Sequence, residues 1–486
     1  MTGKGLAPEQ AIDKATELYE AAAGRLRAAL EAFVTKGETP DAKSRMRGDF
    51  CYPQLRLHYD DPTGPPPPLS RAFAKLAEEG VYATTITQPA FFRPYLLEQL
   101  THIVADYPVK LEVGVSKSEI PYPYVLEHAQ HIDAEALPPA EFARWFPIPG
   151  LKTIGDEVVD GEIWASPEGV MPLALFDAPR VDFSLQRLKH YTGTPFEHFQ
   201  RYILFTNYHR YVDHFVEWAA DRLKQPGPYT LLSAPGGIQV DAKTKNGAQL
   251  IAEGPWRRHQ MPAYHLVGPN RTGITLVNIG VGPSNAKTIT DHLAVMRPEC
   301  WIMVGHCGGL RHSQRIGDYV LGHASLRDDH VLDAVLSPSI PVPPIAEVQV
   351  ALQEAAEKVT GEDNETLKRR LRTGTVVTTD DRNWELRFTA NRSRFNKSRA
   401  IAIDMESATI AANGYRMRVP YGVLLCVSDK PLHGEIKLAG AANRFYERAI
   451  GEHIRIGIET MEALAAAGGA ALHSRKLRSF DEPPFR

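Results

Sequence analysis

The chain has 486 residues, of which 55 are Lys or Arg and 58 are Asp or Glu, so its formal net charge is −3. This near-neutral total excludes a strongly basic nucleic-acid-binding surface as the default interpretation. Hydrophobic residues make up 43% and charged residues 23% of the chain. These proportions allow a sizeable core and exclude wholesale disorder.

Several classes of protein are disfavoured by what the sequence lacks. No uninterrupted apolar run approaches the roughly 20 residues of a membrane-spanning helix, and the first residues, MTGKGLAPEQ, lack the basic-then-apolar pattern of a secretory signal. The segment His306-Cys307 with His312 matches no standard zinc spacing. The cysteines form no C-x-x-C motif and indicate no disulfide framework: Cys51, Cys300, Cys307 and Cys426. We expect a reduced, cytoplasmic, globular protein without a metal site.

The N-terminal part begins with a helix by pattern. Apolar residues from Ile12 to Phe33 recur at spacings of three and four behind Pro8, and Gly37 ends the run. The proline-rich stretch 60–68 predicts an extended connection. Residues 107–200 show only weak periodicity and predict no topology. Further predicted elements are a strand at Val81–Thr87 and helices at Pro94–Asp106 and Tyr208–Leu223.

A change in composition places the main domain boundary near residue 225. The segment Gln225-Pro226-Gly227-Pro228 breaks the chain, and short β-branched runs follow it. We therefore expect an N-terminal domain of mixed helices and strands over residues 1–225 and an α/β domain over residues 226–486.

Strand-like and helical runs alternate in this second domain. The order Ile274–Ile279, Ser284–Met296 and Trp301–Val304 predicts a strand, a helix and a strand, a βαβ unit that implies parallel strands. A long helix over residues 438–466 closes the domain. The other predicted strands are Tyr229–Leu232, Asp318–Leu321, Thr375–Thr378, Ala400–Ile403 and Tyr421–Val427.

Glycines or polar side chains follow five of these strands directly. In a parallel α/β sheet, ligands bind at the carboxyl ends of strands, so these segments should meet at one crevice. They predict a small-molecule site. The segments are Gly280 to Gly282, Gly305 to Gly309, Thr379 to Asp381, Asp404 to Glu406, and Ser428-Asp429.

The first of these segments is a glycine loop before a helix. Gly280-x-Gly282-x-x-Asn285 lacks the third glycine of the dinucleotide fingerprint, and the chain contains no G-x-x-x-x-G-K-[ST], so neither NAD nor ATP-hydrolysis chemistry is indicated. One interpretation is a tight turn alone. The other is that backbone N–H groups of Gly282, Ser284 and Asn285 face an anion or sugar oxygens.

Two carboxylates at strand ends suggest a division of chemical roles. Glu406 opens a predicted helix, where acidic residues are favoured by the helix dipole alone, but its carboxylate also suits adjacent sugar hydroxyls. Asp429 follows the most apolar strand, where partial desolvation favours an acid that holds and donates a proton. A turn or cap Asp is the alternative at that position.

The basic segment Asp380–Arg399 contains six basic and three acidic residues. Most of these charges are interpreted as a solvated surface. Arg382 and the pair Arg257-Arg258 are candidates to hold a phosphate, because guanidinium groups bind phosphate in a bidentate manner. Trp384 is placed to stack on a planar base.

The strings VGHCGGL, AIDMES and CVSDKPLHGE resemble the strand-end motifs of the purine nucleoside phosphorylase/nucleosidase superfamily. With NIGVGPSNAKT, VTTDDRNWELR and a long N-terminal domain, the chain is similar to the bacterial AMP nucleosidase family. This resemblance implies a nucleoside-phosphorylase-like α/β domain with a mixed, largely parallel sheet flanked by helices, preceded by an N-terminal α+β domain that senses nucleotides and regulates the enzyme.

The resemblance further implies hydrolysis of the N-glycosidic bond of AMP to adenine and ribose 5-phosphate. It assigns N7 protonation to Asp429, the ribose hydroxyls to Glu406 with Met405 against the sugar, and base stacking to Trp384. Catalysis is expected to need no cofactor, while ATP with Mg is the implied activator, phosphate the implied inhibitor and a homohexamer the implied assembly. The remaining substrate-binding candidates are Ser428, Gly282, Asn285 and Gly308.

Departures from the phosphorylase motif keep two alternatives open. Phosphorylases of the hexameric type carry an Arg and a Ser for the attacking phosphate at the places that Met303 and His306 occupy, which favours water as the nucleophile. The segment Ser233–Gly237, interpreted as the first loop, carries no carboxylate, so no water-activating base is identified. The alternatives are a purine nucleoside phosphorylase, which needs phosphate for base release, and a non-catalytic adenine-nucleotide sensor, which needs no acid at N7.

Overall fold

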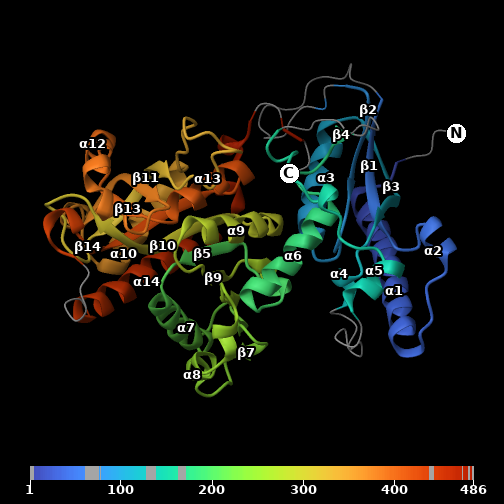
Figure 1. Ribbon diagram of the computed structural model, residues 1–486, viewed down its shortest axis with the longest axis horizontal. Helices are drawn as coiled ribbons and strands as arrows, with labels where there is room; N and C mark the ends of the chain where they lie inside the picture. The colour runs from blue at the N-terminus through green and yellow to red at the C-terminus, as the bar shows by residue number, and fades with distance from the viewer. Residues whose placement is uncertain are drawn as a thin grey trace. The chain divides into compact units, whose positions relative to one another are not determined.

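The computed structural model (Figure 1) describes residues 5–60, 76, 78–126, 138–161, 171–436, 443–472, 474–479 and 482–483. The chain divides into two compact units, one formed by residues 1–186 with 478–486 and the other by residues 187–477. Most of the proline-rich stretch at 60–68 lies outside the described residues.

The N-terminal unit combines a four-stranded sheet with helices. Its strand order is β3-β1-β2-β4, in which β1 pairs antiparallel with both β2 and β3. The elements are α1 (Pro8–Lys36), α2 (Ala42–Met46), β1 (Cys51–Tyr59), β2 (Gly80–Thr85), α3 (Arg93–Asp106), β3 (Val109–Glu119), α4 (Pro123–Leu126), α5 (Pro139–Trp145), β4 (Met171–Pro172) and α6 (Ala178–Thr192), which runs across the boundary between the units.

Helix α1 forms as its apolar spacing predicts. Tyr19, Leu26 and Leu30 lie on one buried face and pack with Tyr52 and other residues of the unit's core. Gly37 ends the helix because its φ of 70° is the left-handed conformation that glycine adopts without strain, and its N–H donates to the carbonyl of Phe33.

The C-terminal unit contains a ten-stranded sheet of order β13-β12-β11-β14-β10-β5-β9-β8-β6-β7, and β13 also pairs with β10. Its strands are β5 (Tyr202–Thr206), β6 (Leu231–Ala234), β7 (Ile238–Val240), β8 (Ala263–Val267), β9 (Ile274–Asn278), β10 (Cys300–Gly309), β11 (Tyr319–Asp328), β12 (Leu371–Thr379), β13 (Ala402–Asp404) and β14 (Tyr421–Asp429).

Helices cover both faces of this sheet. Figure 1 shows α9 and α13 on one side of β5 and β10, and α7 and α14 on the other. The helices are α7 (His209–Leu223), α8 (Gly247–Ala252), α9 (Pro283–Leu293), α10 (Ala346–Thr360), α11 (Asn364–Leu367), α12 (Phe388–Ser398), α13 (Ser407–Met417) and α14 (Asn443–Ala467).

The expected mixed sheet is confirmed, but it contains more antiparallel pairing than expected. Strands β9, β5, β10 and β14 form one parallel set, and β11, β12 and β13 form another. The two sets meet antiparallel at β11–β14 and at β10–β13. The second junction closes five strands into a small barrel, and the strands from β6 to β9 join through antiparallel pairs.

The structure divides the chain at residue 186 rather than near 225. Strand β5 is the reason, because its fully buried residues pair in parallel with both β9 and β10 inside the second sheet. The Pro and Gly residues at 225–228 follow α7 and form a turn within the C-terminal unit.

Candidate active site

The centre of the candidate site is the buried carboxylate of Glu406, at the N-terminus of α13. Its Oε1 accepts a hydrogen bond of 2.6 Å from the backbone N–H of Gly282, and its Oε2 accepts one of 2.8 Å from the side-chain amide of Asn207. Gly282 precedes α9 with a φ of 118°, which favours glycine. Two strand-end loops therefore hold one carboxylate.

A second buried carboxylate lies beside Glu406. Asp404 ends β13, where its Oδ1 accepts from the Thr378 hydroxyl at 2.5 Å and its Oδ2 from the Ser407 N–H at 2.8 Å. Burial and the neighbouring charge of Asp404 raise the pKa of Glu406 to about 8, against the donated hydrogen bonds, which lower it. Burial likewise raises the pKa of Asp404.

Asp429 lies at the end of β14, next to this pair. Gly308 connects the two places, because it is in register with Asp429 of β14 on one side and with Ile403 of β13 on the other. A Cβ atom at residue 308 would lie 3.1 Å from the Ile403 side chain, so the closure of the barrel favours glycine there. The Ser428 hydroxyl donates to Asp429 Oδ1 and holds one oxygen of the acid.

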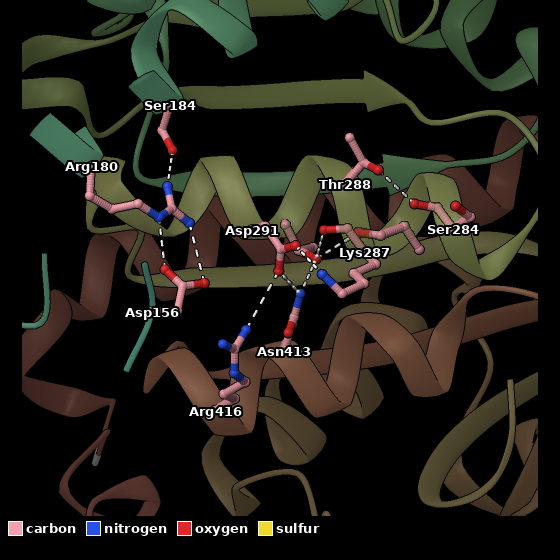
Figure 2. Close-up of polar contacts among 11 residues, drawn as sticks. Asp156, Arg180, Ser184, Ser284, Lys287, Thr288, Asp291, Asn413 and Arg416 are labelled. Carbon is pink, nitrogen blue, oxygen red and sulfur yellow. Dashed lines mark hydrogen bonds and ion pairs between the residues drawn. The ribbon is translucent and has the colours of Figure 1, made fainter. Parts of the chain in front are cut away.

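The two helices that approach Glu406 are clamped to each other. Oδ1 of Asp291 on α9 accepts one hydrogen bond of 2.8 Å from Asn413 of α13 and lies 3.6 Å from the Arg416 guanidinium, as Figure 2 shows. Lys287 pairs with the other carboxylate oxygen of Asp291. Asn413 also donates to the Thr290 hydroxyl at 2.8 Å. This clamp fixes Gly282, just before α9, relative to Glu406, just before α13.

The expected convergence of strand ends is therefore observed for β9, β10, β12, β13 and β14, although these strands do not all run parallel. Met405 lies between the two buried carboxylates in sequence and is partly exposed. Asn285 is the third residue of α9, and its side-chain carbonyl accepts a weak hydrogen bond of 3.4 Å from Gln260.

Trp384 lies mainly in a hydrophobic cluster. Its ring contacts Phe395 edge to face at a centroid distance of 5.6 Å, and Ile403 belongs to the same cluster. Its remaining surface lines a cavity of about 260 Å³ with Pro431 and Leu432, the residues that follow the Asp429 turn.

The three arginines predicted to bind phosphate are exposed. Arg257 lies over the Trp256 ring at 4.3 Å. Among the described residues, no hydrogen bond or ion pair joins Arg257, Arg258 or Arg382 to Glu406.

Within the part of the chain that the structure describes, no three His, Cys, Asp or Glu side chains gather as metal ligands, and no helix has the length and apolar character needed to cross a membrane.

Asn207 is a site residue that the sequence did not indicate. It follows β5, the first strand of the C-terminal sheet, so the first loop of this unit is Asn207-Tyr208 and not Ser233–Gly237, which follows β6. The sequence does contain a signal for a strand at this position, because the apolar run YILFT precedes a predicted amphipathic helix. With the domain boundary predicted near 225, this strand was assigned to the N-terminal domain and its loop was not considered as part of the site.

Comparison with known proteins extends this picture to the whole chain. The profile described as "Bacterial AMP nucleoside phosphorylase N-terminus" matches residues 10–170, and the profile "Phosphorylase superfamily" matches residues 242–465. AMP nucleosidase of Escherichia coli strain K12 is 58% identical over 485 residues, which cover 100% of this chain and 99% of that protein. The chain belongs to the AMP nucleosidase family. The resemblance seen in the sequence motifs is thus confirmed.

More distant relatives match about half of the chain. Guanosine phosphorylase of Halorubrum lacusprofundi is 24% identical over 239 residues, 47% of this chain and 90% of its own. The crystal structure of AMP nucleosidase from Bacteroides thetaiotaomicron covers 58% of this chain and 96% of its own, with 28% identity and a TM-score of 0.43.

Proposed function

We propose that this AMP nucleosidase family member hydrolyses the N-glycosidic bond of AMP to adenine and ribose 5-phosphate. The observation that carries the proposal is the buried Glu406 carboxylate, held by Gly282 and Asn207 one strand away from Asp429. The full-length similarity to proteins named AMP nucleosidase supports AMP as the substrate.

Asp429 acts as the general acid in this proposal. The adenine anion is a poor leaving group, so a proton delivered to N7 as the bond breaks contributes on the order of 10²–10⁴-fold. The Ser428 hydroxyl, which donates to Oδ1 of Asp429, helps to orient this acid at the end of β14. Trp384 and the adjacent cavity of about 260 Å³ support a place for the purine near Pro431.

Glu406 binds the two ribose hydroxyls and stabilises the sugar, with Met405 against it. Positive charge develops on the ribose ring as the C1′–N9 bond breaks, as in other glycoside hydrolyses. A buried carboxylate beside that charge stabilises the transition state more than the ground state. The hydrogen bonds from Gly282 and Asn207 lower the pKa of Glu406, against the larger effect of burial that raises it to about 8, and the positive charge that develops on the sugar favours the same ionised form. Asn285 and Gly308 complete the proposed sugar-binding surface.

The finer parts of the proposal come from the family resemblance. They are a 5′-phosphate held by Arg257, Arg258 or Arg382, activation by ATP with Mg and inhibition by phosphate through the N-terminal unit, a homohexamer and a cytoplasmic location. The exposure of the three arginines supports their access to an anion.

Base release from AMP and from adenosine tests the proposed substrate. Binding energy from the remote 5′-phosphate orients the reacting sugar, so AMP should have a far higher kcat/KM than adenosine. Separation of the products by HPLC measures adenine from both substrates. Equal rates on AMP and adenosine would contradict the nucleotide assignment.

A further inference from the structure

The proposed acid and sugar contacts do not select one purine over another. Every purine nucleotide carries an acceptor at N7 and a ribose, so Asp429 and Glu406 do not distinguish adenine from hypoxanthine or guanine. These bases differ at position 6, where adenine has an amino group and the other two have a carbonyl oxygen. We propose that the carboxylate of Glu385 accepts a hydrogen bond from the 6-amino group and so selects adenine, an inference that rests on the proposed function.

Glu385 lines the cavity of about 260 Å³ that follows the end of β14. A cavity of about 150 Å³ between apolar side chains already holds benzene in another protein, so this one has room for the two rings of a purine. Glu385 contributes the one charged side chain among the described residues of the lining. The other four are apolar or aromatic: Trp384, Phe388, Pro431 and Leu432.

The lining of this cavity is connected to both catalytic carboxylates. Pro431 follows the acid, Asp429, by two residues. Trp384 packs in one cluster with Ile403, which precedes Glu406 by three residues. The cavity therefore lies beside both the proposed acid and the proposed ribose carboxylate, where a base attached to the sugar has to lie.

Gly308 of β10 brings these two parts of the lining together. It is in register with Ile403 on one side and with Asp429 on the other. A Cβ atom at residue 308 would lie 3.1 Å from the Ile403 side chain and 3.6 Å from that of Pro431. The absence of a side chain at Gly308 thus leaves the space between the acid and the cavity open to a planar base.

The Glu385 carboxylate is available to a ligand. It is exposed, and within the described part of the chain it takes part in no hydrogen bond or ion pair. The nearby cation Arg387 lies in the same short turn, Trp384–Arg387, but it pairs with Asp381 at 3.5 Å. Because the buried ring of Trp384 anchors this turn, the carboxylate of the next residue stays beside the cavity.

The chemistry of the purine edge explains the selection. N7 and the group at position 6 lie side by side on one edge of the base. When Asp429 donates to N7, an acceptor on the adjoining cavity wall faces position 6. The amino group of adenine donates to the Glu385 carboxylate, whereas a carbonyl oxygen offers no hydrogen and turns its partial negative charge toward the carboxylate. A hydrogen bond to a charged group contributes on the order of 10–100-fold.

The kcat/KM for AMP divided by that for inosine 5′-monophosphate (IMP) tests this selection, with HPLC to measure the released base. The unsubstituted enzyme should prefer AMP at least ~10-fold. E385A removes the acceptor and the repulsion, so the ratio should fall about tenfold. E385Q should lower the ratio further, because its amide can donate to the carbonyl oxygen of IMP and should raise kcat/KM on IMP itself.

A second variant and a third substrate provide the controls. E354Q removes the same charge at an exposed position of α10 and should leave the ratio unchanged. Purine riboside 5′-phosphate carries only hydrogen at position 6, so its kcat/KM should be the same in E385A and the unsubstituted enzyme. Variants are compared on one substrate at a time, so differences in leaving-group reactivity between the bases cancel.

Three results would overturn the role of Glu385. The first is equal cleavage of AMP and IMP by the unsubstituted enzyme, and the second is a ratio that E385A and E385Q leave unchanged. The third is an equal loss on AMP, IMP and purine riboside 5′-phosphate, which would show that Glu385 only supports the turn. Failure of the unsubstituted enzyme to release adenine from AMP would instead contradict the proposed function.

Discussion

Asp429 and Glu406 have opposite chemical requirements, although both are carboxylic acids at strand ends. Asp429 must hold a proton for the leaving base, and Glu406 must accept hydrogen bonds from a sugar. Their surroundings differ accordingly, because Glu406 is fully buried and accepts hydrogen bonds from the N–H groups of Gly282 and Asn207, whereas Asp429 is only partly buried and accepts a hydrogen bond from the Ser428 hydroxyl.

The acid role of Asp429 predicts a selective loss of turnover in D429N. Asparagine keeps the size of the side chain but delivers no proton, so kcat on AMP should fall at least ~10²-fold. AMP binding, measured by calorimetry, should remain detectable because the sugar site is intact. S428A removes only the hydroxyl that donates to Asp429, so its kcat should fall less than that of D429N. A D429N protein with normal turnover would refute the acid role.

Burial of Glu406 predicts a pH-dependent stability. Its pKa in the folded protein is raised to about 8 from an ordinary value of 4.5, so its contribution to stability is complete below pH 4.5 and is lost as pH rises toward 8. Thermal midpoints should therefore fall less between about pH 5 and pH 8 for E406Q than for the unsubstituted protein. E365Q, at an exposed position of α11, is the control. Identical pH slopes for E406Q and the unsubstituted protein would contradict a raised pKa.

Residue by residue, the sequence indicated the groups whose position depends on local pattern. Glu406, Asp429, Gly282 and Gly308 each follow an apolar run, and the structure brings them together. Asn207 was not predicted, because an amide after a short strand forms no recognisable motif. Its role depends on the hydrogen bond to Glu406, which lies 199 residues away in sequence.

At the scale of elements, the contact between α9 and α13 determines whether the site exists. These helices begin just after Gly282 and Glu406, and they are joined by the clamp of Asn413 with Thr290 and Asp291. Elements such as α1 and α3 could be predicted from apolar spacing. The clamp could not, because it joins polar residues from two helices that only the tertiary fold brings together.

Breaking this clamp should weaken both folding and substrate binding. N413A removes the amide that donates to both Thr290 and Asp291, and the loss of these two buried hydrogen bonds should lower the free energy of unfolding by about 1–3 kcal/mol. KM for AMP should rise, because the Gly282 N–H is no longer fixed against Glu406. N364A, at the exposed start of α11, is the control. Urea midpoints and KM values measure the two effects, and a stable N413A protein with unchanged KM would show that the clamp does not position the site.

At the scale of the whole molecule, the C-terminal unit is a mixed sheet closed on one side, and not the simple parallel sheet that alternating strands and helices suggest. The closure between β10 and β13 depends on pairing between residues about 95 positions apart, Gly308 with Ile403 and Gly309 with Ala402. Local periodicity carries no information on such pairs. The boundary at 186 could not be located from the sequence for the same reason. Only the pairing of β5 with β9 and β10 shows that this strand belongs to the C-terminal unit.

The proposed regulatory role of the N-terminal unit also belongs to this scale. If that unit senses nucleotides, ATP with Mg should raise the rate of AMP hydrolysis by the full chain, and phosphate should lower it. Initial rates with each effector, compared with the same concentration of Mg and sulfate salts, measure this. Rates that do not respond to either effector would contradict regulation.

The central claim is hydrolysis of AMP, and the identity of the sugar product tests it most directly. Purified full-length protein is incubated with AMP in phosphate-free buffer and in buffer with phosphate, and the products are separated by HPLC with mass detection. We predict adenine and ribose 5-phosphate in both buffers. Adenine release only with phosphate, accompanied by ribose 1,5-bisphosphate, would show phosphorolysis and contradict the account.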